Sequence, residues 1–247
     1  MFSHLRKKLI LKKTYDFSAV KKPNLTVVFL HGIASDSSTF SNTIKYLEGT
    51  RSLKNIRFVT FDLLGSGKSK KNDKLNYDYK EQLTALHNSI EKLKLSTPLI
   101  LVGHSMGTFI AARYADTYKK SVKQLILISP PIYTEEDLKN PAFETAIKLF
   151  RDAVSLKNRK ILEEKSFNES INNIVLDNKN YKTLANIKIK TTLIYGDMDR
   201  FIAVYNIPKI LKDNPKYITA IKTIGRHGVS REKYQKMVGI LEEALNA

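Results

Sequence analysis

The sequence of 247 residues contains no cysteine, and it has no long hydrophobic run. The absence of cysteine excludes disulfide bonds and thiolate metal sites, and it fits a cytoplasmic location, which we expect. The longest apolar runs have the length of a strand, far below the roughly 20 residues of a membrane-spanning helix. The N-terminal segment MFSHLRKKLILKK has only Leu9–Leu11 as an apolar centre. We therefore expect no secretory signal and no stable membrane insertion.

Acidic residues are scarce relative to basic ones, with 24 Asp and Glu against 42 Lys and Arg, and the formal net charge is +18. A charge of this sign can indicate binding to nucleic acid or to an anionic membrane. The basic residues, however, occur in short pairs along the whole chain, and aromatic residues do not alternate with them as on a base-stacking surface. We interpret them as a solvated surface and expect no nucleic-acid partner. A weak attraction to anionic surfaces remains open, as does the oligomeric state.

Apolar, β-branched segments alternate with longer helical patterns. Because the apolar segments lack polar alternation, they predict strands that are buried on both faces, as in a parallel sheet. The expected strands are Leu25–Leu30, Ile56–Phe61, Pro98–Val102, Val122–Ile128, Thr191–Tyr195 and Ile218–Ile224. The expected helices are Thr39–Glu48, Asp78–Lys94, Ser105–Lys119, Tyr205–Lys212 and Ser230–Leu245. With one or two antiparallel edge strands in Leu5–Phe17, this order predicts a doubly wound, mostly parallel α/β sheet.

The region 131–186 breaks this alternation, because it shows helical patterns and no strand signal. Its apolar residues recur at helical spacing, as in Phe143, Ile147, Phe150, Val154, Ile161 and Leu162. We interpret 131–186 as a helical cap, or lid, inserted into a core made of residues 1–130 and 187–247. Such a stripe packs the cap onto the sheet, and Phe143, Ile147 and Phe150 are also candidates for lining a substrate pocket.

The sequence Gly103-His104-Ser105-Met106-Gly107 has the pattern G-x-S-x-G. An expected strand precedes it and an expected helix follows it, which is the context of a nucleophile elbow. The turn is so tight that the serine adopts a strained backbone angle, and Gly103 and Gly107 are required where a side chain would collide with its neighbours. We therefore predict that Ser105 is a nucleophile.

A serine hydroxyl reacts as a nucleophile only when a base takes its proton, and the chain has five histidines. His4 lies in the N-terminal segment, and His87 lies in the middle of an expected helix. His31 and His104 lie inside motifs that place them beside the site. His227 follows the last expected strand, at the carboxyl edge where active sites assemble in open α/β sheets. We predict that His227 is the base.

The base needs a carboxylate that fixes its tautomer, and the segment GDMDR offers Asp197 and Asp199 at the end of a strand. Either residue satisfies the chain order serine, acid, histidine that accompanies this elbow. We prefer Asp199 and expect Asp197 to cap the turn, while the ability of Asp197 to substitute remains open. The strand Val122–Ile128 ends in Ser-Pro-Pro, which supplies no acid there.

Acyl chemistry also needs donors for a developing oxyanion. The amide of Met106, directly after the predicted nucleophile, is one candidate. The other is the amide of Ile33, in a loop where Gly32 allows a sharp turn and where we expect His31 to brace the chain through hydrogen bonds.

The segment DLLGSGKS, residues 62 to 69, ends like a phosphate-binding loop, G-x-x-x-x-G-K-[ST]. The first glycine of that pattern is replaced by Asp62, and no apolar helical stripe follows Ser69. We therefore expect no nucleotide site. We expect Gly65 and Gly67 to form a turn, Asp62 to bind its backbone amides, and Lys68 to be solvated.

Taken together, His31-Gly32, Asp62–Ser69, Gly103–Gly107, Gly196–Asp199 and His227 make the chain, from about Thr26 onward, resemble the α/β-hydrolase superfamily. The resemblance is to small bacterial esterase/lipase-like members with a helical cap. Two features depart from many members: Arg226 precedes the histidine, and the residues Phe201–Val204 lack a proline. A serine at position 105 disfavours the aspartate-dependent dehalogenases and epoxide hydrolases.

The resemblance implies a serine hydrolase that cleaves carboxylic esters through an acyl-enzyme on Ser105, without a metal or organic cofactor. The implied substrates are small molecules, namely short- to medium-chain acyl esters or monoacylglycerol-like esters. The same motifs also fit a thioesterase, a C–C bond hydrolase, an acyltransferase or a cofactor-free peroxidase. A non-catalytic binding protein of the same fold is an alternative of another class.

Overall fold

The computed structural model describes residues 9–157 and 164–247. Its centre is a seven-stranded sheet with the strand order β1-β3-β2-β4-β5-β6-β7. The strands are β1 (Lys12–Ser18), β2 (Leu25–Leu30), β3 (Ile56–Asp62), β4 (Leu99–His104), β5 (Val122–Ile128), β6 (Lys190–Gly196) and β7 (Ile218–Thr223). Strand β1 pairs antiparallel with β3, and the other neighbours pair in parallel. The expected doubly wound, mostly parallel sheet is therefore confirmed.

The six parallel strands occupy the expected segments, with ends that differ by at most two residues. The largest difference is at β4, which continues through Gly103 and His104 because these residues pair with Leu127 and Ile128 of β5. Glycine and histidine carry little strand signal, so the pairing partner decides where this strand ends. In the N-terminal segment β1 is one antiparallel edge strand, and residues 5–8 of that segment lie outside the described residues.

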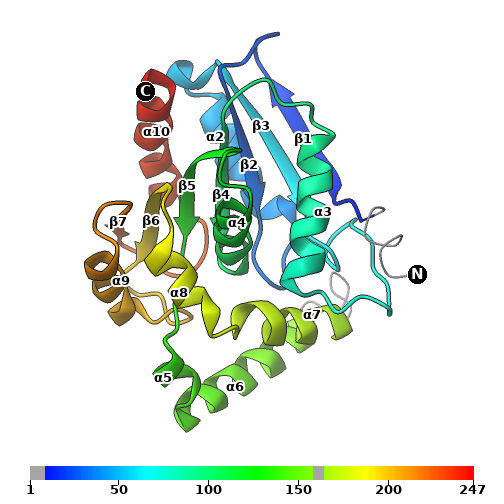
Figure 1. Cartoon of the computed structure of the whole chain (residues 1–247), viewed down its shortest axis with the longest axis vertical. Helices are drawn as coiled ribbons and strands as arrows, with labels where there is room; N and C mark the ends of the chain where they lie inside the picture. Colours follow the sequence, from blue (N-terminus) through cyan, green and yellow to red (C-terminus); the bar gives the residue numbers. More distant parts are fainter. Residues whose placement is uncertain (1–8, 158–163) are drawn as a thin grey trace.

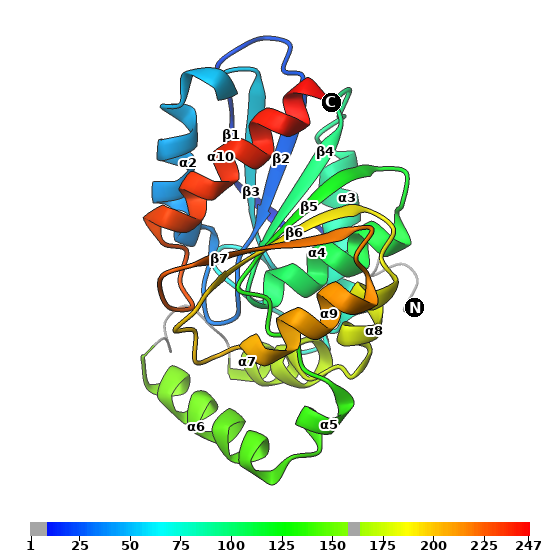
Figure 2. The same ribbon diagram turned by 90° about the vertical axis from the view of Figure 1, so that its left-hand side faces the viewer.

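Each face of the sheet has its own apolar core, because successive side chains of a strand point to opposite faces. In β2, Val27 and Phe29 belong to one core, and Val28 and Leu30 belong to the other. Helices α2 and α10 cover the first face, and α3, α4, α8 and α9 cover the second (Figures 1 and 2). These helices are α2 (Ser41–Glu48), α3 (Tyr79–Glu91), α4 (Met106–Thr117), α8 (Lys179–Asn186), α9 (Ile207–Asp213) and α10 (Arg231–Asn246).

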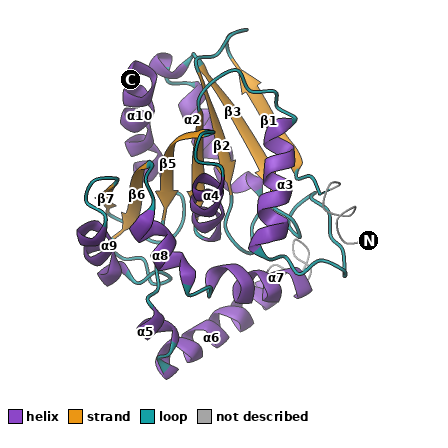
Figure 3. Cartoon of the chain, viewed as in Figure 1, coloured by secondary structure: helices purple, strands orange, loops and turns teal. Residues whose placement is uncertain are grey.

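The described chain between β5 and β6 consists of helices joined by loops and contains no strand, as the colouring in Figure 3 shows. It contains α5 (Glu135–Leu138), α6 (Pro141–Lys157), α7 (Glu164–Ser170), the π-helical turn η3 (Ile171–Val175) and α8. Helices α5, α6 and α7 lie together at the lower end of the molecule in Figures 1 and 2, whereas α8 packs against α4 and α9. Ile161 and Leu162 of the expected stripe lie outside the described residues.

Short 3₁₀ segments complete the described chain: η1 (Ser37–Phe40), η2 (Arg51–Leu53) and η4 (Val204–Asn206). Among the described residues, no helix combines the length and the apolar character that crossing a bilayer would require.

Candidate active site

Ser105 lies between the end of β4 and the start of α4, with φ 52° and ψ −123°. A positive φ is uncommon for a residue with a side chain, and the surrounding structure must hold it. The backbone amide of Ser105 donates to Ile128 of β5 at 3.0 Å, and its carbonyl accepts from the amide of Thr108 at 3.0 Å. These bonds hold the strained residue between the sheet and the helix. Ser105 is 8% exposed.

The glycines on either side of Ser105 allow α4 to approach the sheet closely. A Cβ atom on Gly103 would lie 2.5 Å from the carbonyl oxygen of Gly107. A Cβ atom on Gly107 would lie 2.2 Å from the carbonyl oxygen of Leu30 in β2. Both distances are far below van der Waals contact, and both neighbours are backbone atoms that cannot move aside. The turn around Ser105 therefore accepts only glycine at these two positions.

Asp199 and His227 face each other across the loops that follow β6 and β7. The Nδ1 atom of His227 lies 3.1 Å from Oδ1 and 3.0 Å from Oδ2 of Asp199. The Asp199 side chain is fully buried, and that of His227 is 20% exposed. Asp197, the other acid in the sequence, is exposed and accepts a hydrogen bond from the amide of Gly225 at 3.1 Å. The structure therefore brings Asp199, and not Asp197, to the histidine.

The Asp199 carboxylate is surrounded by donors. Besides His227, it accepts a hydrogen bond from the amide of Phe201 at 3.0 Å, and the hydroxyl of Ser129 also acts to lower its pKa. Burial raises the pKa of Asp199, but the hydrogen bond and charge of His227, together with the other two donors, outweigh burial and leave the pKa below its ordinary value. An ionised carboxylate only accepts hydrogen bonds, so Nδ1 of His227 carries the proton and Nε2 is the acceptor.

His104 connects the elbow with the loop that carries His227. Its Nε2 atom donates to the backbone carbonyl of His227 at 2.9 Å, and the two rings lie 5.1 Å apart. Burial lowers the pKa of His104 to about 3, and the charge of His227 acts in the same direction. His104 is therefore neutral near pH 7, with its proton on Nε2.

The loop after β2 lies directly against Ser105. A Cβ atom on Gly32 would lie 2.9 Å from Cβ of Ser105. His31 is buried, its Nε2 atom accepts from the amide of Leu63 at 2.9 Å, and its Nδ1 atom donates to the carbonyl of Gly32 at 2.8 Å. His31 thus ties the loop to the turn after β3. Ile33, the candidate second oxyanion donor, follows Gly32 in this loop and is half-buried.

The three candidate pocket residues on α6 have different surroundings. The ring of Phe150 lies 5.6 Å from the ring of Phe201, which in turn lies 5.4 Å from the ring of His227. Phe143 and Ile147 line a hollow of about 750 Å³, whose other lining residues belong to α5, α6 and the segment around η3. Of the three candidates, Phe150 is therefore the one that is linked to His227, through the ring of Phe201.

Three residues near the site, Phe201, Ser129 and Lys233, are not predicted from the sequence to have a role in it. Phe201 stands two positions after Asp199, and its exposed fraction of 53% is large for a phenylalanine. In the sequence, Ser129 is only a residue that supplies no acid after β5, and Lys233 is not distinguished from the many other lysines. Proximity to Asp199 in the chain could have pointed to Phe201, whereas nothing in the local sequence distinguishes Ser129 or Lys233.

The other two histidines in the chain are remote from these contacts or outside the described residues. The ring of His87 on α3 stacks on the ring of Tyr118 at 4.1 Å. His4 lies outside the described residues. The described part of the chain holds no cluster of three or more histidine and carboxylate side chains that could bind a metal ion.

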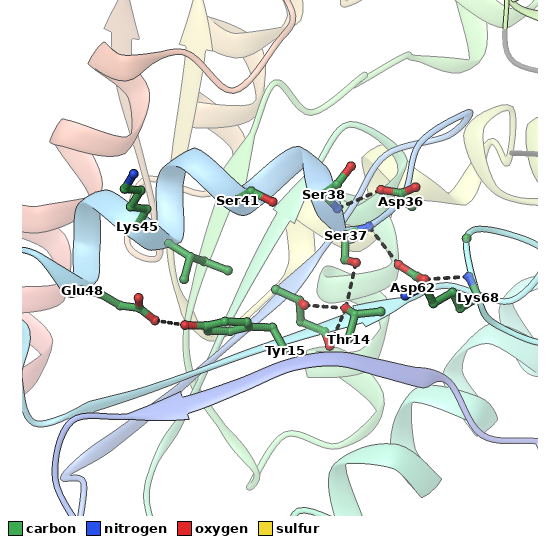
Figure 4. Close-up of a pocket in the computed structure, with 13 residues that line it drawn as sticks. Thr14, Tyr15, Asp36, Ser37, Ser38, Ser41, Lys45, Glu48, Asp62 and Lys68 are labelled. Atoms are coloured by element: carbon green, nitrogen blue, oxygen red, sulfur yellow. Dashed lines mark hydrogen bonds between the residues drawn. The ribbon is translucent and has the colours of Figure 1, made fainter.

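The turn after β3 borders a separate polar hollow of about 390 Å³, shown in Figure 4. The carboxylate of Asp62 accepts from the amide of Ser37 at 2.9 Å and from the amide of Lys68 at 2.7 Å, as the dashed lines show. Asp36 and Glu48 also line the hollow beside Lys45 and Lys68, so its lining carries charges of both signs. The Lys68 side chain is exposed, and Asp62 holds the turn together.

Comparisons with known proteins agree with this architecture. The chain is 36% identical over 121 residues to the probable lysophospholipase BODYGUARD 5 of Arabidopsis thaliana, an alignment that covers 49% of this chain and 27% of that protein. It is 26% identical over 227 residues to Lipase 1 of Psychrobacter immobilis, covering 77% of this chain and 67% of that protein. The chain thus spans about a quarter of the length of the Arabidopsis relatives that it matches.

Among solved structures, the esterase EaEST from Exiguobacterium antarcticum superposes with a TM-score of 0.71 at 19% identity, covering 94% of each chain. At this identity the likeness shows the fold alone. The model of the alpha/beta hydrolase fold family matches residues 26–160, more than half of the chain. This protein therefore belongs to the alpha/beta hydrolase fold family.

Proposed function

We propose that this protein hydrolyses carboxylic esters through an acyl-enzyme on Ser105. The observation that carries the proposal is the hydrogen-bonded pair of Asp199 and His227, with Nδ1 3.0 Å from Oδ2, on loops at the sheet edge where Ser105 is held in a strained turn. Relatives named lipase and lysophospholipase support an ester as the substrate. Each of the three residues supplies what nucleophilic catalysis on an ester requires.

In the first half of the reaction, the Oγ atom of Ser105 attacks the ester carbonyl carbon while Nε2 of His227 takes the hydroxyl proton. Asp199 holds the ring in the required tautomer and stabilises the imidazolium that forms. The tetrahedral oxyanion is stabilised by the amides of Met106, at the N-terminus of α4, and of Ile33. When the intermediate collapses, the imidazolium gives its proton to the departing alkoxide, which leaves as an alcohol.

In the second half, water takes the place of the alcohol. His227 removes a proton from the water, the resulting hydroxide attacks the acyl carbon, and the imidazolium returns the proton to Oγ of Ser105. The products are a carboxylic acid and the free serine. Ser105 is thus the nucleophile in the first half and the leaving group in the second, and His227 acts as base and then as acid in both halves.

We propose uncharged acyl groups of short to medium length, including monoacylglycerol-like esters, as substrates. The aromatic rings of Phe150 and Phe201, at 5.6 Å from each other, support this class because they present apolar surface and the ring of Phe201 lies 5.4 Å from that of His227. We further propose that the helices within 131–186 act as a cap over the site, since α6 supplies Phe150.

The test is hydrolysis of p-nitrophenyl acetate, butyrate and octanoate by the wild type and by the Ser105→Ala and His227→Ala variants. We expect each variant to lose at least about a thousandfold in kcat. Circular dichroism and the unfolding temperature serve as controls for folding. A folded Ser105→Ala variant with the wild-type rate would contradict the mechanism.

Labelling with a fluorophosphonate probe, followed by mass mapping of the adduct, tests the nucleophile without the choice of an ester. We expect one adduct, on Ser105, that is absent from the Ser105→Ala variant. A wild type that forms no adduct and hydrolyses no ester would support the alternative of a non-catalytic binding protein. Acyl thioesters in the same assay distinguish a thioesterase.

A further inference from the structure

Lys233, in the first turn of α10, is completely buried, with an exposed fraction of 0%. Lysine is almost never fully buried unless its charge has partners, because the ammonium group loses its hydration. Burial lowers the pKa of Lys233, while the charges of Asp199 and Glu232 act in the opposite direction. A buried lysine in a chain rich in exposed lysines requires a specific explanation.

The ammonium group of Lys233 is surrounded by acceptors from the proposed active site. Its Nζ atom donates to the backbone carbonyls of Arg226 at 2.6 Å and Gly228 at 2.9 Å, and to the hydroxyl oxygen of Ser129 at 2.8 Å. An ammonium group has three protons, so these three acceptors satisfy it, and the carbonyl oxygen of His227 lies 3.5 Å from the same Nζ atom. Arg226 and Gly228 are the neighbours of His227 in the chain, and Lys233 therefore holds the histidine loop on both sides.

The contact between Lys233 and Ser129 determines where the hydroxyl proton of Ser129 can point. Ser129 follows β5, is fully buried and has a positive φ of 50°. Its backbone amide donates a hydrogen bond to the carbonyl of Ile194 in β6, which helps to hold this conformation. Because an ammonium group can only donate, the oxygen of Ser129 must accept from Lys233. The single proton of the hydroxyl is then free to point at its other neighbour, Asp199, whose pKa the Ser129 hydroxyl lowers.

We propose that Lys233 is a positioning residue of the active site. It fixes the backbone on both sides of His227, and through the hydroxyl of Ser129 it orients the Asp199 carboxylate toward Nδ1 of the histidine. Lys233 touches neither the substrate nor the reacting atoms. This inference rests on the proposed function, because it assigns Lys233 to the placement of the proposed base.

The test compares five variants with the wild type in the p-nitrophenyl butyrate assay: Lys233→Met, Lys233→Arg, Ser129→Ala, the double variant of Lys233→Met with Ser129→Ala, and Lys236→Met. Lys236 lies on the same helix and is exposed, so it is the matched control for loss of one lysine. The readouts are kcat, KM and the unfolding temperature. The rate of fluorophosphonate labelling of Ser105 reports the reactivity of the nucleophile independently of the ester.

We expect Lys233→Met and Ser129→Ala each to lower kcat by about 10- to 100-fold, because small displacements of catalytic groups have effects of this size. We expect KM to stay within about threefold, since Lys233 does not contact the substrate. The double variant should lose little more than the more severe single variant, because both changes break one chain of contacts. Lys233→Arg, which keeps the charge and the donors, should recover part of the loss, and Lys236→Met should behave as the wild type.

A folded Lys233→Met variant with wild-type kcat and labelling rate would overturn the inference. So would a fall in kcat that only matches the fraction of unfolded protein, or losses in the two single variants that multiply in the double variant. If Lys233→Met does not fold, Ser129→Ala decides, and wild-type kcat in that folded variant overturns the inference. A wild type without hydrolysis and without labelling of Ser105 refutes the proposed function instead, and the inference falls with it.

Discussion

The Nε2 atom of His104 donates a hydrogen bond to the backbone carbonyl of His227, over 2.9 Å. His104 is the last residue of β4 and immediately precedes Ser105, while His227 lies in the loop between β7 and α10. One buried bond therefore connects the two segments that the proposed reaction must hold together. The bond requires a proton on Nε2 of His104, and the burial of this ring, which lowers its pKa, has consequences for the pH dependence of stability.

We predict that His104 makes the folded protein less stable in acid. Its pKa is about 3 in the folded state and near 6.5 in an unfolded chain, so the unfolded state binds more protons between these values. The contribution of His104 to stability is thus fully present above about pH 6.5 and is lost as the pH falls toward about 3. Urea unfolding at pH 7 and pH 5 should show a loss roughly 2 kcal/mol larger in the wild type than in His104→Gln.

Gln keeps a donor at the position of Nε2 but does not titrate, so it is the control for this effect. Equal losses of stability in the two proteins between pH 7 and pH 5 would contradict the prediction.

The two acids of the segment GDMDR should differ sharply in their effect on catalysis. Asp199 contacts Nδ1 of His227 at 3.0 Å, whereas Asp197 is exposed and bonds to the amide of Gly225. We expect Asp199→Asn to lower kcat by about 10⁴-fold, because an amide no longer selects the required tautomer of the histidine. Asp197→Asn should stay within about threefold of the wild type. Comparable losses in both variants would show that the acid has been misassigned.

Gly107 on α4 and Gly239 on α10 should respond in opposite ways to alanine. A Cβ atom on Gly107 would lie 2.2 Å from the carbonyl oxygen of Leu30, whereas one on Gly239 would meet nothing within 4 Å. We expect Gly107→Ala to destabilise the fold by about 3 kcal/mol or more, as overpacking does at its upper range. Gly239→Ala should raise stability by up to about 1 kcal/mol, because alanine favours the helix. The unfolding temperatures of the two variants check this prediction, and a stable Gly107→Ala protein would disprove the close approach.

In the turn DLLGSGKS, the aspartate should matter more than the lysine. Asp62 accepts from the amides of Ser37 and Lys68, while the side chain of Lys68 is exposed. Asp62→Ala leaves both amides without this acceptor and should lower the free energy of unfolding by about 1–3 kcal/mol. Lys68→Ala should change stability by less than about 0.5 kcal/mol and leave ester hydrolysis intact. A severe loss of turnover in folded Lys68→Ala would assign this lysine a role that its exposure does not suggest.

Phe150 on α6 should affect long acyl chains more than short ones. Its ring lies 5.6 Å from that of Phe201, which lies beside His227, whereas the adjacent Leu149 is 64% exposed. We expect Phe150→Ala to raise KM for p-nitrophenyl octanoate by about tenfold, with little effect on the acetate, because the longer chain loses apolar contact. Leu149→Ala is the matched control and should leave both values unchanged. Equal changes for octanoate and acetate would argue against contact with the acyl chain.

Much of the fold could be predicted because a buried parallel strand needs a continuous apolar run, and few other structures share that pattern. The segments of β2 and β5 were located to the residue. The end of β4 was missed because Gly103 and His104 have no strand preference of their own and are held by pairing with β5. Strand ends depend on the partner strand, which a local pattern does not contain.

The sequence by itself determined the alternation of strands and helices, the elbow around Ser105 and the aspartate that replaces a phosphate-loop glycine at position 62. These follow from residue types at fixed spacing, where sterics allow few backbones. Only the tertiary structure decided between Asp197 and Asp199. Only the tertiary structure showed that Lys233, unlike the exposed lysines, is buried against the loop that carries His227. Those choices depend on distances between loops that are far apart in the chain, and packing of the whole sheet sets these distances.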